Sequence, residues 1–122
     1  MPSKFLNHAE MVRSLVKPGE DIILGLTAGT ANLLHMAVGV SGESGELLDA
    51  VKKTAIYNKP LDLSNVIEEL GDLEFYMEGI RQQLGITRDR CLIANMVKLE
   101  RRYKERKYSD EAAQLRADKQ EN

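Results

Sequence analysis

Apolar residues recur every three or four positions along most of the chain, which is the spacing of the buried face of an α-helix. This pattern predicts three long helices and two shorter ones, at residues 5–16, 30–57, 63–85, 88–106 and 109–116. No stretch shows the two-residue alternation of a half-buried strand, and no internal repeat is present. The sequence therefore predicts an all-α fold, a bundle of about four main helices.

Proline and threonine mark where the predicted helices stop and start. Pro18, followed by glycine, separates the first segment from the rest, and Pro60 ends the long helix before it. Threonine hydroxyls are suited to capping a first helical turn, so Thr30 and Thr87 are expected N-caps. Residues 20–29 stay open between a helix and an apolar connecting segment, because their glycines weaken a helix.

The helix predicted over residues 30–57 is apolar around most of its circumference. Its apolar positions include Leu33, Leu34, Ala37, Val38, Val40, Leu48, Val51 and Ile56. A helix without a wide polar face is buried on several sides. We therefore expect this helix at the centre of a bundle or of a homo-oligomer.

Composition narrows the class of protein. The 122 residues predict a single domain, 43% of them are apolar, and the formal net charge of -2 gives no electrostatic case for nucleic acid or an anionic membrane. The single cysteine, Cys91, excludes an internal disulfide framework and is expected to be a small buried apolar residue rather than a nucleophile. Without a signal core or a long apolar run, the chain is expected to be soluble and cytoplasmic.

Two pairs of acids carry the most specific chemistry. Glu43 and Glu46 lie three residues apart, and so do Glu69 and Asp72. Residues at this spacing share one side of a helix, so four carboxylates can converge from two neighbouring helices. Oxygen ligands gathered in this way suit a hard divalent cation such as Mg²⁺.

Helical phase separates Glu69 from the other acids. Glu69 falls inside an apolar arc, Asp72 lies at the edge of that arc, and the adjacent Glu68 points elsewhere. A carboxylate on an apolar face requires a cation or several hydrogen-bond donors. Glu69 is therefore the acid whose surroundings most demand a cation.

Three glycines lie beside these acids, at positions 42, 45 and 71. Each costs about 1 kcal/mol relative to alanine inside a helix. Their presence favours either a close approach of helices or room for a ligand. The alternative is that a chain with 30% charged residues produces spaced acids by chance, and that the glycines mark loose turns.

A second set of polar residues lies on the helix predicted from residue 88. Asn95, Lys98 and Arg102 share one side, and their amide and cationic groups could bind phosphate oxygens. The alternative is an ordinary solvated charged face. His35 faces partly toward the acids, although a core histidine is the commoner case. A di-iron bundle would need Glu-x-x-His pairs, and neither His8 nor His35 follows a glutamate by three.

The order of these motifs resembles a known family. It runs from His35 through Gly-Glu43-Ser-Gly-Glu46, Lys52-Lys53, Glu-Glu69-Leu-Gly-Asp72 and Asn95-x-x-Lys98-Leu-x-x-Arg102-Tyr103 to Tyr108-Ser-Asp-Glu-Ala. This arrangement is similar to the MazG-like nucleotide pyrophosphohydrolases of the all-α NTP pyrophosphatase superfamily. The resemblance covers about residues 32–117 of a single domain, residues 1–29 match less clearly, and residues 117–122 are expected to be a frayed tail.

The resemblance implies roles for particular residues. The Mg²⁺ ligands and catalytic acids would be Glu43, Glu46, Glu69 and Asp72, with Mn²⁺ as an alternative ion. The phosphate-contacting residues would be Asn95, Lys98 and Arg102, with Lys52, Lys53 and Tyr103 as neighbours, and His35 would approach the nucleotide. The family also implies a homodimer or homotetramer with sites built between packed helices.

The implied reaction is Mg²⁺-dependent hydrolysis of a nucleoside or deoxynucleoside triphosphate to the monophosphate and pyrophosphate, in house-cleaning or control of nucleotide pools. Phosphoribosyl-ATP, dUTP and dCTP are alternative substrates. The non-enzymatic alternative is a helical interaction protein that keeps the fold without the activity.

Overall fold

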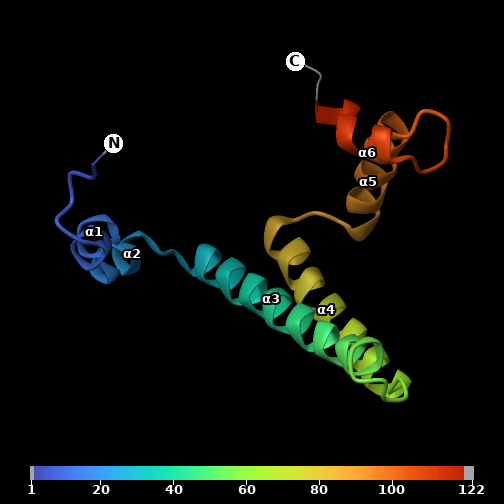
Figure 1. The fold of residues 1–122 in the computed structure, drawn as a ribbon, viewed down its shortest axis with the longest axis horizontal. Helices are drawn as coiled ribbons and strands as arrows, with labels where there is room; N and C mark the ends of the chain where they lie inside the picture. Colours follow the sequence, from blue (N-terminus) through green and yellow to red (C-terminus); the bar gives the residue numbers. More distant parts are fainter. Residues whose placement is uncertain (1, 120–122) are drawn as a thin grey trace.

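A computed structural model describes residues 2–119, and every regular element in that range is helical. The elements are α1 (His8–Leu15), α2 (Gly19–Gly25), α3 (Ala28–Ala55), α4 (Leu63–Leu84), α5 (Arg88–Arg102), α6 (Asp110–Leu115) and the short 3₁₀ helix η1 (Ala117–Lys119). Figure 1 shows α3 and α4 side by side as a long hairpin, with α1 and α2 beyond the start of α3. The predicted all-α class is confirmed.

Side-chain caps fix where several helices begin. The hydroxyl of Thr87 accepts a hydrogen bond from the backbone N–H of Arg90 at the start of α5, which confirms that predicted cap. The prediction of Thr30 as the cap of α3 was wrong. Thr27 is the N-cap, and Thr30 lies in the first turn, where its hydroxyl accepts a hydrogen bond from the Thr27 N–H.

The region that the sequence left open, residues 20–29, is divided between two helices. Residues up to Gly25 form most of α2, and residues from Ala28 onward belong to α3. Leu26 and Thr27 connect them.

The second helix of the hairpin, α4, ends at Gly85. This residue adopts a left-handed φ of 67°, a conformation that glycine reaches without strain.

Two glycines let α3 and α4 approach closely. A Cβ atom at Gly39 would lie 2.2 Å from the ring of Tyr76, and one at Gly79 would lie 2.3 Å from the sulfur of Met36. For the glycines beside the acids, the sequence left two alternatives, close helix approach or room for a ligand, and the structure agrees with the second. Added Cβ atoms at positions 42, 45 and 71 would meet nothing within 4 Å, so the space beside the acids is open.

Beyond the hairpin, the chain is loosely arranged. After α4 the chain turns through residues 85–87, and α5 runs away from the hairpin to pack against α6 and η1 (Figure 1). None of the described helices is both long enough and apolar enough to cross a lipid bilayer.

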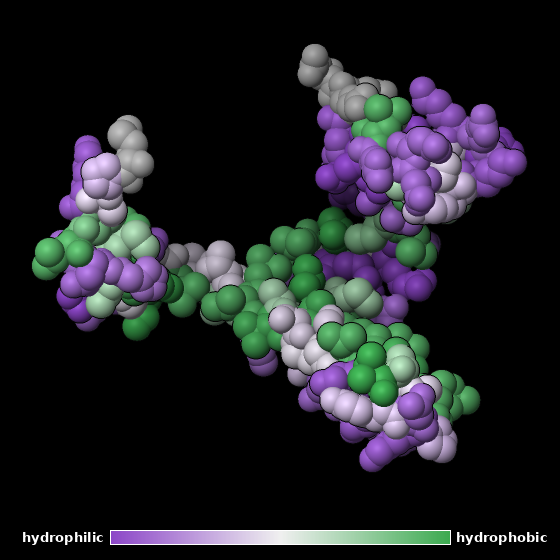
Figure 2. All heavy atoms as spheres, in the orientation of Figure 1, coloured by the Kyte–Doolittle hydropathy of each residue, from purple (hydrophilic) through white to green (hydrophobic). Residues whose placement is uncertain are grey.

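A single chain buries very little apolar surface. Among the described residues, Ala50 is the one buried apolar side chain, while large side chains on the hairpin, such as Val38 and Phe75, are more than 60% exposed. On the face in view, Figure 2 shows hydrophobic residues over much of the hairpin, a mixture of both kinds at its lower end, and mostly hydrophilic residues around α5 and α6. The surface area of 10217 Å² exceeds by roughly 3,600 Å² the value of about 6,600 Å² expected for a compact monomer of this mass.

Candidate metal and phosphate site

An acidic cluster lies in the middle of the hairpin. Glu43 comes from α3, and Glu69 and Asp72 come from successive turns of α4. One carboxylate oxygen from each of the three lies within 4.8 Å of the others. Helical packing thus brings together residues that are about 26 to 29 positions apart in the sequence, as their spacing predicts.

Glu69 is the buried member of the cluster, with 8% of its surface exposed. The pKa of its carboxyl group is raised from 4.5 to about 7. Hydrogen bonding to Glu43 is the largest cause of the raised pKa, followed by burial and then by Glu46. Like charges at close range disfavour ionisation, so the metal-free cluster retains a proton near neutral pH.

The cluster fits a divalent cation. One buried oxygen of Glu43, Oε2, and one of Glu69, also Oε2, have no hydrogen-bond partner among the described residues. Buried carboxylate oxygens without donors are costly, and a hard cation is the ligand that such oxygens bind best. Asp72 is exposed, so the cluster is accessible from solvent.

Glu46 has a different position from the other three predicted ligands. It is exposed one turn after Glu43 on α3, and none of its oxygens belongs to the group within 4.8 Å. It nevertheless interacts with Glu69, since it contributes to the raised pKa of that residue. Glu46 therefore borders the cluster rather than completing it in the metal-free chain.

The predicted phosphate-binding face does not meet the acids within one chain. Asn95, Lys98 and Arg102 all lie on α5, which packs on α6 and η1 and is directed away from the hairpin (Figure 1). Asp72 is also about 18 Å along α4 from the end of that helix. A single chain thus presents the acidic and basic groups on separate surfaces.

Arg102 is held by a residue that the sequence did not single out. Its Nε donates a hydrogen bond to Oδ1 of Asp118 in η1 over 3.0 Å, and the side chain of Asp118 is only 4% exposed. Burial alone would raise the pKa of Asp118, but the hydrogen bond from Arg102 lowers it below its ordinary value. The sequence shows no helical periodicity around Asp118, and this residue lies in the segment that was expected to be a frayed tail.

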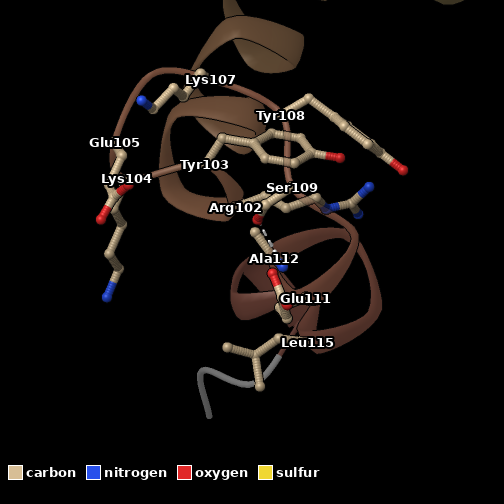
Figure 3. Close-up of a pocket in the computed structure, with 10 residues that line it drawn as sticks. All are labelled: Arg102, Tyr103, Lys104, Glu105, Lys107, Tyr108, Ser109, Glu111, Ala112 and Leu115. Atoms are coloured by element: carbon tan, nitrogen blue, oxygen red, sulfur yellow. Dashed lines mark hydrogen bonds between the residues drawn. The ribbon is translucent and has the colours of Figure 1, made fainter.

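Two cavities flank Tyr103, and one of them is also lined by Arg102. One, of about 430 Å³, is lined by Arg102 and by residues of the 103–115 segment, several of which point into it in Figure 3. The other, of about 560 Å³, reaches back along α5 to Asn95. The rings of Tyr103 and Tyr108 lie 5.7 Å apart between their centroids, so aromatic and cationic side chains share this end of α5.

The other residues predicted to contact the substrate, Lys52, Lys53 and His35, lie along α3. Lys53 forms an ion pair with Asp49 over 3.3 Å, and the Nζ of Lys52 lies 5.5 Å from the ring centroid of Tyr57. Both lysines are therefore engaged locally near the end of the hairpin. His35 is exposed on α3, roughly 12 Å along the helix from Glu43.

Comparison with known proteins places this arrangement in a family. Residues 32–107 match the MazG nucleotide pyrophosphohydrolase domain, and that range contains the whole acidic cluster and all of α5. No curated protein and no solved structure matches the chain. Because the match covers more than half of the 122 residues, the chain belongs to the MazG nucleotide pyrophosphohydrolase domain family.

Proposed function

We propose that this protein is a Mg²⁺-dependent pyrophosphohydrolase that converts nucleoside or deoxynucleoside triphosphates to monophosphates and pyrophosphate. The observation that carries the proposal is the cluster of Glu43, Glu69 and Asp72, whose ligand oxygens lie within 4.8 Å of one another beside open space. The chain's membership of the MazG family supports a nucleotide as the substrate.

The acids would act together on the metal and on water. Glu43, Glu69 and Asp72 would hold Mg²⁺, which when bound neutralises phosphate charge and lowers the pKa of water. Binding would require Glu69 to release the proton that it retains without metal. Glu46, which borders the cluster, would accept a proton from the attacking water as a general base.

The residues of α5 would stabilise the charge that develops on the phosphates. Lys98 offers an ammonium group, and Arg102 offers the two Nη groups of a guanidinium whose Nε is held by Asp118. Asn95 and Tyr103 would contact the nucleotide from the cavities at that end of α5. Lys52, Lys53 and His35 are further candidates for contact with substrate.

We further propose that a second copy of the chain completes the site in a homodimer or homotetramer. Two findings support this. Acids and cations of one chain lie on separate surfaces, and the chain exposes roughly 3,600 Å² more than a compact monomer would. In such an assembly α5 of one copy would face the acidic cluster of another.

The decisive experiment measures pyrophosphate release from the purified protein with Mg²⁺ or Mn²⁺. The substrate panel contains the common ribo- and deoxyribonucleoside triphosphates together with dUTP, dCTP and phosphoribosyl-ATP, which separates the substrate classes. Glu69→Gln should abolish hydrolysis, because it removes a ligand charge from the cluster. The matched control is Glu68→Gln, which neutralises the exposed neighbouring acid on the same helix and should leave the rate unchanged.

Absence of pyrophosphate release from every substrate, together with equal thermal stability with and without Mg²⁺, would overturn the proposal. That pair of results would favour a non-catalytic helical interaction protein.

A further inference from the structure

Arg102 meets its carboxylate partner through one edge of the guanidinium group. Its Nε donates a hydrogen bond to Oδ1 of Asp118 over 3.0 Å, and among the described residues no acceptor takes a hydrogen bond from its Nη groups. The Nε and Nη hydrogens lie in one rigid plane, so fixing the direction of Nε–H restricts the directions of the others. Asp118 therefore restrains the guanidinium and leaves its Nη groups open to a second anion.

The same arginine forms part of a cavity wall. Figure 3 shows Arg102 among the residues that line the cavity of about 430 Å³ beside Tyr103, and Asp118 is not one of those residues. Burial opposes the charged form of Asp118, but the hydrogen bond from Arg102 holds the pKa of this carboxyl below its ordinary value. A buried, ionised carboxylate thus holds a cation whose side chain faces both the protein and a cavity.

The path of the chain to Asp118 includes an unfavourable backbone conformation. Arg116 ends α6 with a left-handed φ of 48°, which residues with long side chains adopt rarely. The N–H of Lys119 then donates to the carbonyl of Arg116 over 2.8 Å, and η1 packs against α5. Conformations of this kind persist where surrounding contacts maintain them. The ion pair between η1 and Arg102 is such a contact.

The charge of Asp118 alone would act against phosphate binding. A carboxylate beside a phosphate-binding arginine lowers the local positive potential, so its removal should strengthen the attraction of phosphate. A carboxylate that orients the guanidinium has the opposite effect, because a fixed donor stabilises developing charge better than a mobile one. The two roles therefore predict opposite results for the same substitution.

We infer that Asp118 is a positioning residue of the proposed hydrolysis, which holds the Arg102 guanidinium so that its Nη groups meet the phosphates of the substrate. Asp118 acts through Arg102 and touches no substrate itself. It lies beyond residues 32–107, so the family match gives it no role. This assignment rests on the function proposed above and extends the site to the C-terminal 3₁₀ helix.

Steady-state kinetics of pyrophosphate release by the full-length chain test the assignment. Asp118→Asn should lower kcat by roughly tenfold to a hundredfold, because the cation remains but its direction is no longer fixed. KM should change by less than about threefold, since the charge that attracts the substrate is kept. Asp118→Glu keeps a charged acceptor and should retain more of the wild-type kcat than Asp118→Asn does.

A double-mutant cycle tests whether Asp118 acts through Arg102. Arg102→Ala removes the group that Asp118 is inferred to orient. In that background, Asp118→Asn should lower kcat by less than about twofold, because no guanidinium is left to misplace. A loss as large as in the wild-type background would overturn the assignment.

General loosening of the C-terminal segment is the structural alternative, and Ala113→Gly is the matched control. Glycine weakens α6 without touching the ion pair, and Ala113 lines neither cavity beside Tyr103. Hydrogen-exchange mass spectrometry shows how far each variant loosens residues 104–119. Even where α6 exchanges as fast as in Asp118→Asn, Ala113→Gly should keep kcat within about twofold of wild type.

Three further results would overturn the positioning role while the wild-type chain is active and the proposed function stands. An equal kcat for Asp118→Asn and wild type would show that the reaction does not need Asp118. A higher kcat or a lower KM would show that its charge opposes phosphate binding. An equal loss in Ala113→Gly would assign the effect to loosening. A wild-type chain that releases no pyrophosphate from any substrate would overturn the positioning role and the proposed function together.

Discussion

Arg102 donates its Nε hydrogen to Asp118 over 3.0 Å, and this ion pair joins the end of α5 to the C-terminal 3₁₀ helix. Arg102 belongs to the Asn-Lys-Arg-Tyr motif, whereas Asp118 lies beyond the residues that match the family. With 17% of the Arg102 side chain and 4% of the Asp118 side chain exposed, neither group is well solvated. Each therefore depends on the other, because a buried charge without its partner is strongly unfavourable.

We predict that Asp118→Asn loosens the C-terminal segment. The variant leaves the Arg102 guanidinium without a carboxylate partner, so amide hydrogens of α6 should exchange roughly tenfold faster than in wild type. Hydrogen-exchange mass spectrometry of residues 104–119 measures this directly. Glu105→Gln, which neutralises an exposed acid of the same segment, serves as the control and should exchange like wild type. Unchanged exchange in Asp118→Asn would show that the ion pair does not hold the segment.

The stability of the metal-free protein should fall as pH rises from about 4.5 to about 7. The pKa of Glu69 is raised from 4.5 to about 7, chiefly by its hydrogen bond to Glu43, so in this range the folded chain keeps a proton that the unfolded chain has released. A folded state that binds more protons loses stability as pH increases. Denaturant unfolding in EDTA, followed between pH 4.5 and 8, measures the slope.

Glu69→Gln should flatten this pH dependence, because glutamine does not titrate. It should also make the metal-free chain more stable than wild type at pH 8, where Glu69 is charged beside Glu43. Glu68→Gln keeps the cluster intact and should retain the slope of wild type. A wild-type stability that is level across this pH range would contradict the role assigned to Glu69.

Mg²⁺ should raise the melting temperature of wild type, by roughly 10 °C at a concentration one hundred times its dissociation constant. The expected cause is binding to the folded cluster of Glu43, Glu69 and Asp72. The shift should shrink below pH 7, where a proton on Glu69 competes with the cation. Differential scanning fluorimetry at pH 6 and pH 8 tests both statements, and an equal shift for Glu69→Gln would place the cation elsewhere.

Local signals in the sequence were sufficient for most of the helices and for the acidic cluster. Thr87 caps α5, and Ser109 caps the short helix predicted after it, because a cap depends on residues only three positions away. Glu69 was identified as the buried acid because helical phase fixes which residues share a face. The same reasoning misplaced the start of α3 at Thr30, since both partners of the Thr27–Thr30 capping box are threonines.

Contacts between distant residues were not predictable in the same way. The sequence suggested a phosphate-binding face on the helix that begins at residue 88, but the direction of α5 depends on the turn at Gly85 and on packing against α6 and η1. The ion pair of Arg102 with Asp118 spans 16 positions and follows no helical spacing. The neighbours of a glycine on another helix are equally hard to predict. The closely packed Gly39 was therefore overlooked, and for the glycines beside the acids the choice between close packing and room for a ligand stayed open.

The contrast among glycines yields a last prediction, on the stability of the hairpin. Gly39→Ala should lower the free energy of unfolding by about 2 kcal/mol or more, because the added methyl group would lie 2.2 Å from the rigid ring of Tyr76. Gly79→Ala should cost less, since the atom it meets is the sulfur of the flexible Met36 side chain. Urea unfolding monitored by circular dichroism measures both variants against wild type.

The matched control is Gly42→Ala, three residues along the same helix, where an added Cβ meets nothing within 4 Å. Alanine favours a helix by up to about 1 kcal/mol over glycine, so this variant should be as stable as wild type or more stable. The opposite signs at positions 39 and 42 follow from packing alone, because helix propensity acts in the same direction at both. Stabilisation by Gly39→Ala would mean that α3 and α4 do not pack through Gly39 and Tyr76 in solution.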